Sequence, residues 1–496
     1  MLCGMSILPD ATDRMDPINK VMGVTALALI AVVVPLVVLV QQKSRSLMER
    51  SLPDPAPEWV QDESASPEPA GEFTTRCQLV AKVNYELRFV DPANRAALAV
   101  DEDSHELVDP ARAMMMIDKL AISRTDRLRA AIVAGELVGV DEANRRLALL
   151  EEEVTPGSEL LTDLQWIHEI YTSEQGGSGV PRDAREWLVS RHGWFGEVAL
   201  SHRGRQRARL LGGLERINAV RAGFGLYSGI AFLIGIGFAI KGVAMTLAGT
   251  FGDTLDAPSF KGPVYGEMFA VFAILMLLVL GGGMLAIVGS REFASAMMVV
   301  TEVLMWGCLA ALAWPVLRGV DWQFVKMDLG LHTGEGWRKE IGFGIAAYLC
   351  DLPLTLLVSG VVAWLVSMGG EEAAKVGVEG SPMFRPLGGS SWLAFTIGAL
   401  GTVVWAPITE EIIFRGALYR MLRLHLPWIP SVLISAVIFG AMHGYDLPGL
   451  AGVATGGVIY GVLREYRGSL IASITAHVLH NGTITLSSWM FLLALN

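Results

Sequence analysis

The apolar run SWLAFTIGALGTVVWAPI at residues 391–408 leads directly into TEEIIFR at residues 409–415. The first stretch carries no charge and is long enough to form most of a membrane-spanning helix. The second carries two glutamates and an arginine, and a hydrocarbon environment disfavours such groups by about 2.5–3.5 kcal/mol each. The sequence therefore predicts a membrane helix that carries functional ionisable side chains.

The composition of the whole chain agrees with this interpretation. Of 496 residues, 52% are hydrophobic and 18% are charged, and the mean hydropathy is +0.44; soluble domains carry about 25% charge. Charge is uneven, with 31 of the 274 residues from 223 to 496 charged, against 53 of the 182 residues from 41 to 222. We therefore expect an all-α fold: a polytopic transmembrane helix bundle, an N-terminal anchor helix and a mostly helical extramembrane domain. The net charge of −11 argues against a nucleic-acid partner.

Five regions are expected along the chain. The apolar run at 21–40 is followed by polar residues rather than by a small-residue cleavage site, which favours an uncleaved signal anchor. The expected regions are 1–45, a signal-anchor transmembrane helix; 46–72, a Pro/Glu-rich linker; 73–201, a helical extramembrane domain of unknown role; 202–317, a basic juxtamembrane segment and transmembrane helices; and 318–496, the domain that carries the chemistry.

Ionisable side chains in the last hundred residues supply the candidate chemistry. Glu411 and Arg415 are four residues apart, so they share a helix face and can form an ion pair. Glu410 points about 100° away from Glu411 on an α-helix, because each residue advances the helix by that angle. Glu410 therefore needs a partner other than Arg415.

Two further apolar segments carry imidazole and amide groups. His443 ends the segment 429–443, and His477 and Asn481 are four residues apart in the last helix. A carboxylate and an imidazole around one water can deprotonate it for attack on a carbonyl carbon. A second imidazole and an amide can donate hydrogen bonds to the oxygen that becomes negative. If these segments converge with Glu410, the sequence describes a water-activating hydrolase in a membrane.

The three motifs together resemble those of a known family. Glu-Glu-x-x-x-Arg at 410–415, Phe-x-x-x-His at 439–443 and His-x-x-x-Asn at 477–481 occur in the order and separation of the CAAX protease and bacteriocin-processing (CPBP) family of intramembrane endopeptidases. In these motifs the chain resembles the CAAX prenyl protease type 2 group. The family-like region extends over about residues 318–496.

The resemblance implies a role for each motif residue. The implied roles are activation of water by Glu410 and His443, binding of the oxyanion by His477 and Asn481, and support of the site by Glu411 and Arg415. Members are commonly described as metalloproteases, and Glu410, His443 and His477 are donor types that suit a catalytic zinc site. The chain has no His-Glu-x-x-His motif, so metal-free activation of water by glutamate stays open beside a divalent metal such as zinc. His480 is expected to support the site or to face lipid.

The implied partners are a membrane-associated or lipidated protein or peptide substrate and the lipid bilayer, with no nucleic acid. The localisation that follows is integral and multi-pass, in the plasma membrane, or in the inner membrane of a bacterium. The alternative function is non-proteolytic: an ion- or proton-coupled transporter, or a scaffold, that uses the same buried polar residues. An aspartyl intramembrane protease is disfavoured, because Gly252-Asp253 lacks the preceding glycine of a Gly-x-Gly-Asp motif.

Overall fold

The computed structural model describes residues 17–50, 72–87, 110–121, 123–248, 255, 263–288, 300–301, 303–368, 396 and 398–495. Residues 51–71 of the predicted linker and residues 391–395 of the predicted span lie outside the described residues. Contacts divide the chain into two compact units. The first unit falls within residues 1–47, 228–380 and 401–482, and the second within 48–227, 381–400 and 483–496.

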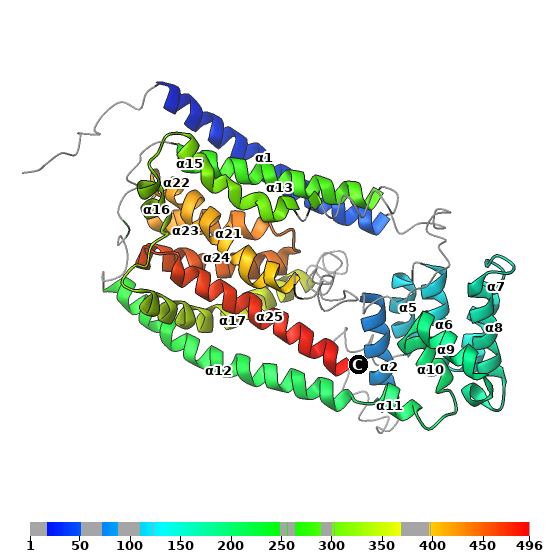
Figure 1. The fold of residues 1–496 in the computed structure, drawn as a ribbon. Coiled ribbons are helices and arrows are strands. Elements are labelled where there is room, and N and C mark those ends of the chain that lie inside the picture. The colour runs from blue at the N-terminus through cyan, green and yellow to red at the C-terminus, as the bar shows by residue number, and fades with distance from the viewer. Residues whose placement is uncertain are drawn as a thin grey trace, which may run out of the picture. The chain divides into compact units, whose positions relative to one another are not determined.

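Helices make up the first unit (Figure 1), and no strand occurs in the part of the chain that the structure describes. The long helices that contribute to it are α1 (Pro17–Arg50), α12 (Leu214–Leu247), α13 (Val264–Val288), α17 (Trp337–Ser367), α23 (Trp428–Ala441), α24 (Leu447–Arg467) and α25 (Ile471–Leu495). The shorter elements are η3 (Cys308–Ala313), α15 (Trp314–Leu317), α16 (Trp322–Leu329), η4 (Gly401–Trp405), α21 (Ala406–Glu410), η5 (Glu411–Leu418) and α22 (Tyr419–Arg423). Helix α24 packs against both α17 and α23 and so lies at the centre of the C-terminal helices.

Four of the described helical segments are long and apolar enough to cross a membrane. They are Arg207–Gly242, Val264–Gly282, Trp337–Val366 and Leu447–Arg467. Large apolar side chains on α12 are exposed, including Leu233 and Ile240 at 73% and 64%. Such exposure suits a surface that faces lipid, because water would penalise it. The all-α, polytopic fold class expected from the composition is confirmed.

Arg464 on α24 joins three of the C-terminal elements. Its side chain is completely buried and donates to the main-chain oxygens of Asp328 at 2.6 Å, Arg415 at 3.2 Å and Gly468. Gly330 ends α16 with φ +82°, and a Cβ there would lie 2.6 Å from Nη1 of Arg464. Glycine is therefore required both for the backbone conformation and for the space. This arginine holds α16, η5 and the end of α24 together.

The second unit is a cluster of helices around α6. Its elements are α2 (Glu72–Leu87), α5 (Pro110–Leu120), α6 (Arg124–Leu137), α7 (Val140–Glu151), α8 (Glu159–Thr172), η2 (Gly176–Gly179), α9 (Arg182–His192), α10 (Trp194–Leu200) and α11 (Arg207–Leu211). Helix α6 begins with a capping box, in which the Ser123 side chain accepts from the Asp126 main-chain N–H and the Asp126 carboxylate accepts from that of Ser123. Every residue of α6 from Leu128 onward is buried. The described residues of 73–201 are mostly helical, as the fold class predicted.

Asp163 on α8 holds α9 in place. Its buried carboxylate accepts from Trp187 Nε1 at 2.7 Å and Arg191 Nε at 2.8 Å, and lies 3.0 Å from Nε2 of His192. Burial by itself raises the pKa of this carboxyl, but the bonds to His192, Arg191 and Trp187 outweigh it and hold the pKa below its ordinary value. Trp187 is 36% exposed, and its indole N–H binds this carboxylate.

We expect Asp163→Asn to lower the free energy of opening of α8 and α9 by about 2–3 kcal/mol at neutral pH, since a hydrogen-bonded buried charge is lost. The pKa of Asp163 is lower in the folded state, so its contribution is present above the unfolded value of about 3.9 and is lost as pH falls through the folded value. Hydrogen exchange of the full-length protein measures both effects. Asp118→Asn is the control: it breaks a half-exposed pair with Arg146, and we expect it to cost less than about 1 kcal/mol. Equal exchange in the two variants would contradict the assignment.

Candidate active site

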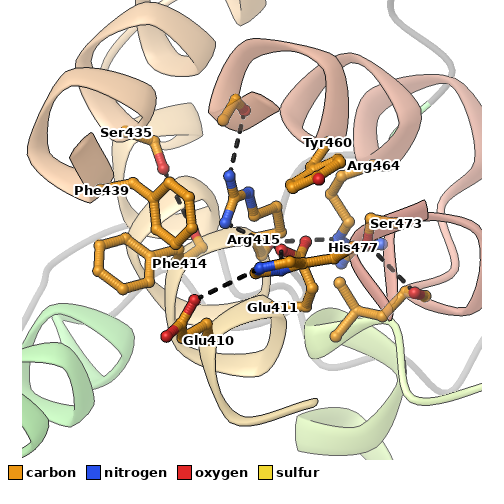
Figure 2. A network of polar contacts seen from close by, with 12 residues as sticks. Glu410, Glu411, Phe414, Arg415, Ser435, Phe439, Tyr460, Arg464, Ser473 and His477 are labelled. Atoms are coloured by element: carbon orange, nitrogen blue, oxygen red, sulfur yellow. Dashed lines mark hydrogen bonds and ion pairs between the residues drawn. The ribbon is translucent and has the colours of Figure 1, made fainter. Parts of the chain in front are cut away.

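Glu410 ends α21, directly before η5, a stretch with π-helical hydrogen bonding. Its Oε2 atom lies 3.7 Å from Nε2 of His477 and 3.8 Å from Nε2 of His443; Figure 2 shows the first of these contacts. The same oxygen is buried and has no hydrogen-bond partner within the described structure. Three segments that are distant in the sequence therefore meet at this carboxylate.

The second nitrogen of each imidazole has a partner that only accepts. His443 Nδ1 lies 2.7 Å from the main-chain oxygen of Phe439, and His477 Nδ1 lies 3.0 Å from Oε1 of Glu411. Each Nδ1 therefore carries a proton, and in a neutral imidazole the lone pair is then on Nε2, toward Glu410. With both imidazoles neutral, three acceptor atoms face one another; in the doubly protonated form of His477, its Nε2–H is a donor. A group that donates protons, such as a water molecule, is what this arrangement can bind.

Glu411 and Arg415 form the ion pair expected from their spacing. Arg415 Nη1 donates to Glu411 Oε1 at 3.0 Å, and both side chains are essentially inaccessible. Arg415 Nη2 also donates to the main-chain oxygen of Gly457 on α24 at 3.3 Å, and its guanidinium lies 4.2 Å from the ring centre of Phe439 on α23. Because Glu411 Oε1 also binds His477, this pair links η5 to α23, α24 and α25.

Gly457 provides the space for this arrangement. A Cβ atom at that position would lie 3.0 Å from Cα of Ala436 and 3.3 Å from Nη2 of Arg415. A larger residue would push α24 away from α23 or displace the guanidinium. The close approach of the two helices therefore depends on a residue without a side chain.

Asn481 lies beside this cluster, one helical turn after His477 on α25. Its amide nitrogen donates to the main-chain oxygen of Thr402 in η4 at 2.9 Å. The four-residue spacing places Asn481 and His477 on one face of α25, as the sequence predicts. The hydrogen bond to Thr402 connects α25 to η4, the π-helical element before α21. One of its two amide hydrogens is engaged in this bond, and the other can bind a ligand.

His480 does not face lipid, which was one of the two expectations for it. Its Nδ1 lies 2.7 Å from Oδ2 of Asp351 on α17, and Asp351 is fully buried. The hydroxyl of Tyr460 donates to the same oxygen at 2.6 Å. Asp351 and Tyr460 lie outside the three motifs and were not predicted as part of the site. The signal for Asp351 was available, because it is an acidic residue within the otherwise apolar stretch from Ile341 to Ser367.

The donor set at the candidate site is chemically suitable for zinc, since carboxylate and imidazole are both ordinary zinc ligands. Among the described residues, however, no group of three or more His, Cys, Asp or Glu side chains is arranged to hold a metal ion. The divalent metal at Glu410, His443 and His477 therefore stays a prediction, which the metal content of the purified protein would decide.

Comparison with known proteins bears on the same region. Residues 392–483 match a family model described as "Rce1-like: Type II CAAX prenyl endopeptidase Rce1-like". The matched range contains all three motifs and confirms the resemblance drawn from them. No curated protein and no solved structure gave a significant match to the chain. Members of the matched family are integral membrane proteins, and together with the four long apolar helical segments this makes the chain a multi-pass membrane protein.

We expect Glu411→Gln to lower the stability of the protein by about 3 kcal/mol, because it leaves the buried guanidinium of Arg415 without its carboxylate. The thermal unfolding midpoint in detergent measures this loss. Glu335→Gln is the matched control, since Glu335 is 57% exposed and its pairs with Lys339 and Arg467 are screened by solvent. If the two variants unfold at the same temperature, the buried pair is not what stabilises these helices.

Proposed function

Residues 392–483 belong to the CPBP family of CAAX-type proteases, and from this we propose that the protein is an intramembrane endopeptidase. It hydrolyses a peptide bond of a membrane-associated or lipidated protein or peptide. The observation that carries the proposal is the convergence of Glu410 Oε2 on the Nε2 atoms of His443 and His477. The family description names a type II CAAX prenyl endopeptidase, which makes a prenylated CAAX chain end the first substrate class to test.

Glu410 and His443 activate the water in this mechanism. Two acceptors 3.8 Å apart are both within reach of one water molecule, because each hydrogen bond spans about 2.8 Å. His443 orients the water through Nε2, and Glu410 takes its proton as the oxygen attacks the carbonyl carbon of the substrate. The carbonyl oxygen then carries the negative charge of a tetrahedral intermediate.

Asn481 and His477 stabilise that oxygen. Asn481 donates the amide hydrogen that Thr402 does not use. His477, with both nitrogens protonated, donates Nδ1–H to Glu411 and Nε2–H to the substrate. Fixed donors of this kind act strongly in a site that excludes water, because they need no reorganisation when charge develops.

Glu410 completes the reaction by returning its proton. The proton passes to the amide nitrogen of the leaving group as the carbon–nitrogen bond breaks. One carboxylic acid and one amine are released for each water consumed, and Glu410 is again ionised. The burial of Glu411 and Arg415 supports this cycle, since their pairing holds His477 while the substrate binds and leaves.

We expect Glu410→Gln to reduce cleavage by about 10³-fold or more, because the amide cannot accept the proton of the water. A fluorogenic farnesylated peptide with a CAAX end, supplied to the purified protein in proteoliposomes, is the first probe. Peptides that accumulate in membranes of cells carrying the variant identify other substrates. Asn481→Ala should lose about 10²–10³-fold, the usual effect of one oxyanion donor.

Glu335→Gln again serves as the control and should cleave like the unaltered protein, since Glu335 is solvent-exposed. Undiminished cleavage by Glu410→Gln would overturn the proposal. If no peptide accumulates in cells and the Glu410→Gln variant instead loses ion or proton flux, the alternative of a transporter is the correct function.

A further inference from the structure

Asp351 is a buried carboxylate that the proposed reaction does not use. It lies on α17 with no exposed surface. Its Oδ2 accepts from the hydroxyl of Tyr460 at 2.6 Å and lies 2.7 Å from Nδ1 of His480, while its Oδ1 accepts from Thr355 at 3.1 Å. A carboxylate inside a membrane helix is costly unless such partners compensate it. Its position beside the candidate site therefore calls for a role.

Tyr460 connects this carboxylate to the candidate site. Its ring is stacked on the imidazole of His477, with ring centres 5.0 Å apart and planes inclined by 23°. Figure 2 shows Tyr460 beside His477 and Arg415, and the guanidinium of Arg415 lies 5.2 Å from the centre of the same ring. The hydroxyl at one end of the ring is held by Asp351, so the plane against which His477 stacks is held as well.

The Asp351 carboxylate also affects the position of His477 through its contact with His480. The two histidines lie three residues apart on α25, and each contacts a carboxylate from a different element: Glu411 of η5 for His477, and Asp351 of α17 for His480. Side chains three apart on a helix are only about 60° apart around its axis. Two such contacts on neighbouring positions restrict the rotation of α25 about its own axis.

We propose that Asp351 and Tyr460 are positioning residues for His477. Asp351 anchors the Tyr460 ring and the His480 side chain, and through them it sets the orientation of the His477 imidazole toward Glu410. The catalytic part of this inference rests on the proposed function. The contact between Tyr460 and His477 is a ring stack, so no proton passes along it and its effect is on geometry alone.

Geometry of this kind affects the chemical step more than substrate binding. Displacing a reacting group by about 1 Å can cost about 100-fold in rate. Removal of the Tyr460 hydroxyl keeps the ring itself, so the displacement of His477 should be smaller than this. We therefore expect the rate to fall about tenfold. The loss should appear in kcat, because His477 stabilises the transition state and not the bound substrate.

The discriminating variant is Tyr460→Phe, which keeps the stacked ring and removes only the hydroxyl. On the farnesylated CAAX peptide we expect kcat to fall about tenfold, with KM changed less than about twofold. Asp351→Asn keeps an oxygen that can accept from Tyr460 and should retain more activity than Asp351→Leu, which keeps none. This order of rescue is not expected if Asp351 merely fills space.

Tyr419→Phe is the matched control. Tyr419 is also fully buried, and its hydroxyl also donates to a buried carboxylate, that of Glu465 on α24. The contacts found for its ring do not include His477. It should therefore lose a similar amount of stability while keeping kcat. Equal kcat values for Tyr460→Phe and Tyr419→Phe would overturn the proposal.

A readout that needs no substrate keeps the two proposals separate. In protein labelled with ¹³C at the histidine ε1 carbon, the His477 resonance is assigned by its absence in His477→Gln. We expect Tyr460→Phe to shift this resonance and Tyr419→Phe to leave it unchanged. An unshifted resonance overturns the positioning role even if the protein is a protease. A shifted resonance in a protein that cleaves no substrate supports the arrangement and contradicts the proposed function instead.

Discussion

The buried pairing of Arg415 with Glu411 is the interaction on which the C-terminal helices depend. Two full charges removed from water cost several kcal/mol each unless every donor and acceptor is engaged. Arg415 meets most of this demand by reaching Glu411 on its own element, the Gly457 carbonyl on α24 and the Phe439 ring on α23, while its Nε and Oε2 of Glu411 have no hydrogen-bond partner among the described residues. Glu411 adds His477 on α25. One ion pair thus determines how four elements that are distant in sequence come together.

The other buried carboxylates of the first unit follow the same rule, and Glu410 departs from it. In the described helices four of the others pair with an arginine, Arg318 for Glu267, Arg420 for Asp328, Arg467 for Glu340 and Arg423 for Glu465. The fifth, Asp351, accepts hydrogen bonds from Tyr460 and Thr355 and contacts His480 at 2.7 Å. These contacts hold the packed helices together. Glu410 instead faces two imidazoles at 3.7 and 3.8 Å. Its buried Oε2 lacks a hydrogen-bond partner among the described residues, as does Oε2 of Glu411, but Glu411 is held through Oε1 by Arg415 and His477. That difference separates a carboxylate available for chemistry from those that stabilise the fold.

Much of this was predictable from the sequence, and the missing parts have physical reasons. The membrane class follows from the scarcity of charge, and the pairing of Glu411 with Arg415 follows from a four-residue spacing. The π-helical geometry of η5 was not predictable, because apolar periodicity reports the average turn and not a local widening. Tyr460 was missed because a tyrosine in an apolar helix has no distinctive pattern; only its contact with Asp351, 109 residues away, gives it a role. In the second unit, the contact of Asp163 with His192 was not predictable either, because the two residues lie on different helices.

The adjacent glutamates of the motif show how a membrane site can hold both a fixed frame and a reactive group. Successive residues on a helix point in different directions, so Glu410 and Glu411 occupy different surroundings although they are neighbours in the chain. Glu411 is engaged through Oε1 by Arg415 and His477, so a change at Glu411 disturbs both contacts. Oε2 of Glu410 has no hydrogen-bond partner among the described residues. Glu410 can therefore accept and return a proton without breaking the contacts of Glu411 with Arg415 and His477. Loss of activity after a change at Glu411 therefore combines folding with chemistry, whereas a change at Glu410 leaves the frame in place and reports on the chemistry.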